Sequence, residues 1–214
     1  MSSGGNPLRD VLLEQIESAR SLGRRSLDGL TDDEFWWEPV AGCWSVRRTT
    51  DPRAMRDNEP IGDWIIDGIR PSPDDPPLTS IVWRVVHMTL GTWNWINNLE
   101  GARNAVRAGR TSVEDADKVD LPEPGFRPAA DSSVVLWDDV VVRFRTVTES
   151  FEDSGLATAV TFQWGRTLPP SWIVSHVLRE LLHHSAEVGC LRDLFRQTFG
   201  PQGKSPTLLA PEAP

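Results

Sequence analysis

The sequence of residues 172–188 is WIVSHVLRELLHHSAEV, and it contains three of the four histidines in this 214-residue chain. The stretch is predicted to be a helix because Pro169 and Pro170 precede it, Ser171 can cap it, and no Gly or Pro interrupts the seventeen residues. At about 100° per residue, four ionisable residues fall on one stripe of this helix: His176, Glu180, His184 and Glu187. Apolar residues flank that stripe, so the ionisable groups need partners, and a bound cation is one such partner.

A metal site is indicated by Glu180 and His184, which lie one helical turn apart. Zinc and its neighbours in the transition series accept imidazole nitrogen and carboxylate oxygen. A third ligand is expected from His87, which lies in a nearly all-apolar stretch of a second predicted helix. Two histidines and one carboxylate leave a coordination position open, which is typical of catalytic zinc sites rather than structural ones.

The spacing also permits other partners for these residues. His87 can be a hydrogen-bonded core histidine, and Glu180 can form an ion pair instead, with Arg179, Arg84 or His183. Spacing alone does not separate a metal site from such ion pairs.

Two more residues of the same helix are candidates for supporting roles. His183 can handle protons beside the site. Glu187 can hydrogen-bond a ligand imidazole and fix its tautomer, or it can form a salt bridge with Arg192 or Arg84.

The rest of the chain predicts an all-α four-helix bundle. Long amphipathic helices are expected at residues 7–30, 80–100, 131–151 and 171–199, and a capping box at residues 31–34 starts a short helix. Long connections at residues 38–78 and 101–130 join the first three helices, and no strand pattern is convincing. Residues 1–200 are expected to form one domain, and residues 201–214 a flexible tail.

Residues 179–188 and 191–194 resemble the last helix of the DinB-like superfamily. These metal-binding four-helix bundles include mycothiol-dependent maleylpyruvate isomerase and bacillithiol transferases. Residues 30–46 resemble the turn after that family's first helix, and residues 81–87 resemble its second helix. The resemblance covers nearly the whole chain in the family's order, and it implies the metal ligands His87, Glu180 and His184. Many members carry His at position 180, whereas the isomerase branch carries Glu.

The resemblance also implies an activity. It points to a metal-dependent thiol S-transferase or isomerase that acts on a small electrophile, with zinc as the expected metal and nickel as the alternative. Lys118 and Lys204 are the only lysines among 22 basic residues, which suggests a GC-rich genome and mycothiol as the thiol cosubstrate. The alternatives are a non-catalytic stress or ligand-binding bundle protein and a metal-assisted hydrolase.

Four side chains are candidates for lining a small-molecule pocket, since aromatic walls are common in such sites: Trp44, Trp83, Asn94 and Trp164. Packing in the core is the alternative for each tryptophan. The absent side chain of Gly91, one turn after His87, is expected to leave room beside that histidine.

Composition narrows the partners and the location. The formal net charge of −9 argues against a nucleic-acid partner. No apolar run approaches the roughly 20 residues needed to span a membrane. No signal peptide is evident, so a cytoplasmic location is expected. The helix at residues 171–199 is apolar nearly all round, so a second subunit or the 38–78 connection is expected to cover it, and a homodimer is predicted.

Overall fold

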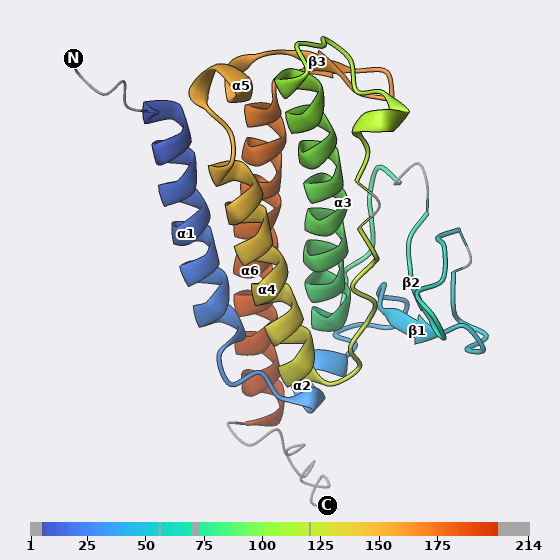
Figure 1. Cartoon of the computed structure of the whole chain (residues 1–214). Helices are drawn as coiled ribbons and strands as arrows, with labels where there is room; N and C mark the ends of the chain where they lie inside the picture. The colour runs from blue at the N-terminus through green and yellow to red at the C-terminus, as the bar shows by residue number, and fades with distance from the viewer. Residues whose placement is uncertain (1–5, 56, 70–72, 120, 201–214) are drawn as a thin grey trace, which may run out of the picture.

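Four long helices dominate the part of the chain that the computed structural model describes, which is residues 6–55, 57–69, 73–119 and 121–200. They are α1 (Pro7–Leu27), α3 (Ile81–Arg107), α4 (Ala130–Glu149) and α6 (Pro170–Phe199). The four helices lie alongside one another (Figure 1) and bury a shared apolar core. The predicted all-α bundle is thereby confirmed. The predicted tail at residues 201–214 lies outside the described residues.

Short elements fill the connections between the long helices. They are α2 (Asp32–Trp36), β1 (Val46–Arg48), β2 (Trp64–Ile66), η1 (Asp115–Asp117), α5 (Asp153–Ala157), β3 (Val160–Thr161) and β4 (Thr167–Leu168). Strands β1 and β2 pair antiparallel, and so do β3 and β4. The sequence showed no convincing strand pattern for these short pairs. Runs of two or three residues are too short to show the alternation of a strand in the sequence.

Two predicted helix ends differ from the structure. Helix α3 continues to Arg107, seven residues beyond the expected end at residue 100, and Gly109 with φ of +70° follows it. The helix continues through Gly101. An added Cβ at this position would lie 3.0 Å from a Val113 side-chain carbon, so the glycine allows the next segment to pack closely against the helix. Helix α1 ends at Leu27 rather than residue 30, since Gly29 with φ of +62° turns the chain.

The predicted capping box is present at the start of α2. The Thr31 hydroxyl accepts a hydrogen bond from the Glu34 backbone N–H, and the Glu34 carboxylate accepts one from the Thr31 N–H. Glu34 also accepts hydrogen bonds from Arg192 of α6 at 3.0 and 3.2 Å, and both side chains are buried. This ion pair fixes the chain after α1 against the C-terminal half of α6.

The apolar surface of α6 is covered largely within the single chain. Val174, Leu178 and Leu181 are buried, and only Leu182 of this group is exposed. Helices α1 and α3 both pack along α6, so this cover requires neither the 38–78 connection nor a second subunit. The argument that led to a homodimer is thereby removed, and the dimer itself stays a prediction. Within the described residues, no helix has the length and apolar character needed to cross a bilayer.

Candidate metal centre

The three predicted ligands meet where α3 packs against α6. His87 comes from α3, and Glu180 and His184 come from α6. Their ligand atoms all lie within 4.8 Å of one another. The Glu180 Oε2 atom is 3.7 Å from His87 Nε2 and 3.4 Å from His184 Nε2. Donor atoms about 2.1 Å from a tetrahedral ion would lie roughly 3.4 Å apart, so the donor set fits a transition metal.

His87 is oriented by the tryptophan one turn before it. The Trp83 ring stacks on the His87 ring, with centroids 4.8 Å apart and planes 10° apart. Trp83 Nε1 donates a hydrogen bond of 2.7 Å to the backbone carbonyl of Asp67, in the 38–78 connection. The Trp44 ring packs against the Trp83 ring, with centroids 6.2 Å apart. Of the predicted pocket residues, Trp83 and Trp44 therefore hold His87 in place, and Trp44 is buried.

His184 is held through its second ring nitrogen. Its Nδ1 lies 2.6 Å from Glu187 Oε2, and because the carboxylate can only accept, Nδ1 carries a proton. Nε2, which is 3.4 Å from Glu180 Oε2, is then the atom placed to bind a cation. Arg84 of α3 donates to the same Glu187 oxygen. Both roles predicted for Glu187 are thus present, since it hydrogen-bonds a candidate ligand and pairs with Arg84. The alternative partner, Arg192, binds Glu34 instead.

The outer residues of the α6 stripe lie at the margin of the centre. His183 is exposed, and its Nε2 lies 3.3 Å from Glu187 Oε1. A second possible metal cluster consists of His183, His184 and Glu187. The Arg84 guanidinium already occupies Glu187 there, and its positive charge opposes a second cation.

His176 lies farther out along the same helix. It stacks on Trp172, with ring planes 3° apart, and its Nδ1 lies 4.0 Å from Glu180 Oε1. Burial lowers the pKa of His176. This residue is outside the groups that can hold a metal among the described residues.

The surroundings of Glu180 favour the charged form of its carboxylate, which is the form that binds a cation. The imidazoles of His184 and His87, whose Nε2 atoms lie 3.4 and 3.7 Å from Oε2, hold the pKa of Glu180 far below its usual range, against the opposing effect of burial. Arg179 Nη2 adds a contact of 3.2 Å to Oε1. Of the ion-pair partners suggested by the sequence, Arg179 does pair with Glu180, whereas Arg84 and His183 contact Glu187. The Oε2 atom faces the two histidines, so the pairing with Arg179 through Oε1 leaves Oε2 in the donor set.

We expect Glu187→Gln to weaken metal affinity by about 10- to 100-fold, the usual effect of removing a charged partner from a ligand imidazole. Zinc affinity can be measured by competition with a chromophoric chelator. The control is His183→Ala, because the exposed His183 also contacts Glu187 but is not one of the three candidate ligands. Equal zinc affinities for Glu187→Gln and the unmodified chain would contradict this role of Glu187.

A cavity of about 440 Å³ opens beside His87. Leu90, Gly91 and Asn94 of α3 line one side, and an added Cβ at Gly91 would meet no atom within 4 Å. The expected space beside His87 and the expected position of Asn94 are therefore present. The other side comes from residues that the sequence did not suggest: Asp57, Asn58, Glu59, Ile61, Ile66 and Glu123. Their loops carry no regular spacing, so only the length of the connections at residues 38–78 and 101–130 hinted at them.

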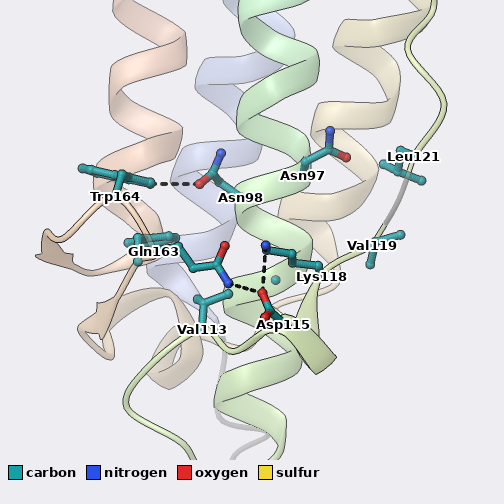
Figure 2. Close-up of a pocket in the computed structure, with 11 residues that line it drawn as sticks. Asn97, Asn98, Val113, Asp115, Lys118, Val119, Leu121, Gln163 and Trp164 are labelled. Carbon is teal, nitrogen blue, oxygen red and sulfur yellow. Dashed lines mark hydrogen bonds and ion pairs between the residues drawn. The ribbon is translucent and has the colours of Figure 1, made fainter.

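Trp164 lines a different cavity, so its predicted place in a pocket beside the metal ligands was wrong. Figure 2 shows this second cavity, of about 500 Å³, with Trp164 on one side and Lys118 on the other. Trp164 Nε1 donates a hydrogen bond of 3.0 Å to Asn98 Oδ1. Asn98 follows His87 by eleven residues, which corresponds to about 16 Å along the α3 axis. His87 is not among the described residues that line this cavity.

Comparison with known proteins agrees with this arrangement. The family model of the DinB superfamily matches residues 15–188, which include the larger part of α1, all of α3 and α4, and all three candidate ligands. No curated protein and no solved structure shows significant similarity to the chain. The match spans well over half of the sequence. The chain therefore belongs to the DinB superfamily.

Proposed function

We propose that this protein binds a divalent cation, zinc or nickel, at His87, Glu180 and His184, and that it acts as a thiol S-transferase or isomerase on a small electrophile. The observation that carries the proposal is the convergence of the three side chains, one of which, His87, also lines a cavity. Two helices supply a donor set with no fourth protein ligand among the described residues. Such a set leaves a coordination position for an exogenous ligand.

The side chains around the centre have distinct parts in this proposal. A divalent cation held there would supply Lewis acidity, which deprotonates a bound thiol at neutral pH. Glu187, held by Arg84, keeps the His184 proton on Nδ1, and Trp83 fixes the plane of the His87 ring. Gly91 leaves the space beside His87 open for the thiol and its acceptor. Mycothiol is the proposed thiol, on the grounds of family and composition.

Cobalt substitution tests this proposal. We expect cobalt(II) to bind at one equivalent, and a low-molecular-weight thiol to add thiolate-to-cobalt charge-transfer absorption in the near ultraviolet. Thiol consumption with a panel of small electrophiles then tests the transfer. Bound metal with no spectral response to thiols and no thiol consumption would instead support a non-catalytic ligand-binding protein. Turnover without thiol would support metal-assisted hydrolysis.

A further inference from the structure

We propose that the cavity beside His87 selects small molecules that carry a positive charge close to the thiol or the electrophilic carbon. It thereby disfavours molecules with a carboxylate at that position. This inference rests on the proposed function, because it concerns the charge of whatever occupies the open position. The cavity and His87 define the site, and the charged residues around the cavity decide which molecules enter it.

Three carboxylates line this cavity: Asp57, Glu59 and Glu123. All three are exposed to solvent and form no ion pair in the part of the chain that the structure describes. The other polar lining groups are the neutral amides of Asn58 and Asn94, together with His87. No described residue that lines the cavity is basic. The described part of the lining therefore carries three carboxylates and no basic side chain to compensate them.

The arginines nearest the centre are already paired. Arg84 is buried, and its guanidinium binds Glu187. Arg179 contacts Glu180 at 3.2 Å and His176 at 2.6 Å. An anionic substrate that took either arginine as its counter-ion would break one of these pairs, whereas a cationic substrate meets carboxylates that have no ion-pair partner among the described residues. The charged residues around the centre thus favour binding of a positively charged substrate over a negatively charged one.

The positions of the metal site and of the three carboxylates indicate which end of a bound molecule should carry the positive charge. A divalent cation with Glu180 and two neutral imidazoles carries a net charge of about +1, which attracts the thiolate end of a molecule. The cavity wall attracts an ammonium or amidinium group at the other end. Because the carboxylates are exposed, salt should weaken the attraction over a Debye length of about 10 Å at 0.1 M.

Three thiols of equal chain length test this selection in the cobalt(II) protein at low ionic strength. They are cysteamine, which is cationic, 2-mercaptoethanol, which is neutral, and mercaptoacetate, which is anionic. Each thiol is titrated into the unmodified chain and into the triple variant Asp57→Asn, Glu59→Gln, Glu123→Gln. The ratio of the two dissociation constants for one thiol cancels the intrinsic acidity of that thiol.

We expect the triple variant to bind cysteamine about fivefold to tenfold more weakly and mercaptoacetate more tightly by a similar factor, with 2-mercaptoethanol unchanged. At 0.5 M salt, the differences should shrink. The matched control is Glu14→Gln, Asp33→Asn, Asp139→Asn, which makes the same change in net charge at exposed positions on α1, α2 and α4. This control should leave all three dissociation constants unchanged.

Equal ratios for the three thiols, or equal effects of the control variant, would overturn the charge selection while leaving the proposed function intact. A cobalt spectrum that responds to none of the thiols would overturn the proposed function itself. The two failures are therefore distinguishable in one set of titrations.

Discussion

Replacement of His184 by alanine is expected to abolish stoichiometric metal binding. His184 supplies one of three donor atoms, and its ring is fixed by Glu187 on one side and directed at Glu180 on the other. Loss of a ligand should exceed the 10- to 100-fold effect of losing a partner that only orients a ligand. We therefore expect affinity to fall by more than about 100-fold. Elemental analysis of the protein purified without added metal measures the result.

The His184→Ala variant must be compared with other variants, because the His184 side chain is buried and its removal can lower the stability of the fold. His87→Ala removes a partly exposed ligand from the other helix and should also lose the metal, with the fold intact by circular dichroism. His176→Ala is the matched control on α6, because His176 lies outside the donor set, and it should retain the metal. Metal retained in His87→Ala, or no stoichiometric divalent metal in the unmodified protein, would exclude this centre.

Arg192→Met is expected to lower the free energy of unfolding by about 3–5 kcal/mol, the usual cost of leaving one member of a buried ion pair without its partner. Arg192 donates to both oxygens of Glu34, and its Nη1 donates to the backbone carbonyls of Ser26 and Asp28. The variant thus leaves a buried carboxylate and two carbonyls without their donor. Urea denaturation at neutral pH measures the change.

The control for this prediction is Arg196→Met. Arg196 also approaches Glu34, with Nε 3.6 Å from Oε1, but it is half exposed, so its loss should cost less than about 1 kcal/mol. A similar fall in the free energy of unfolding for the two variants would show that the burial of Arg192 does not strengthen its contribution to stability.

The effect of Arg192 should also depend on pH. Burial raises the pKa of Glu34, but hydrogen bonds from Arg192 and the Thr31 backbone outweigh it, and the net result is a lowered pKa. A carboxyl with a lowered pKa in the folded state adds stability above its unfolded value, near 4.5, and this stability is lost as the pH falls through the folded value. The gap in stability between the unmodified chain and Arg192→Met should therefore narrow below pH 4.5.

Residue spacing within single helices predicted much of the candidate centre. Glu180 and His184 share a stripe of α6 because a helix places residues four apart on one face. The capping box at Thr31 and Glu34 was also predicted from the sequence, since the two residues hydrogen-bond each other within one helical turn. The pairing of α6 with His87 came from the type of residue and its apolar surroundings, and from the resemblance to a family.

The contacts between elements could not be predicted in the same way. The sequence left Glu187 with two possible arginines and did not suggest that Arg192 would bind Glu34, which is 158 residues away. Trp164 looked equivalent to Trp83 as a pocket wall, yet it lines a separate cavity. The carboxylates at Asp57, Glu59 and Glu123 lie in irregular connections, whose course no periodic pattern describes.

The sequence by itself therefore predicted the four long helices and the stripe of ionisable residues on α6 that contains Glu180 and His184. These features depend on the 3.6-residue repeat and on side-chain chemistry, which are local properties. Only the tertiary structure decided which nitrogen of His184 faces Glu180, which arginine neutralises Glu187, and how much negative charge surrounds the cavity at His87. Those features depend on how α3, α6 and the long connections pack against one another, and packing is a property of the whole chain.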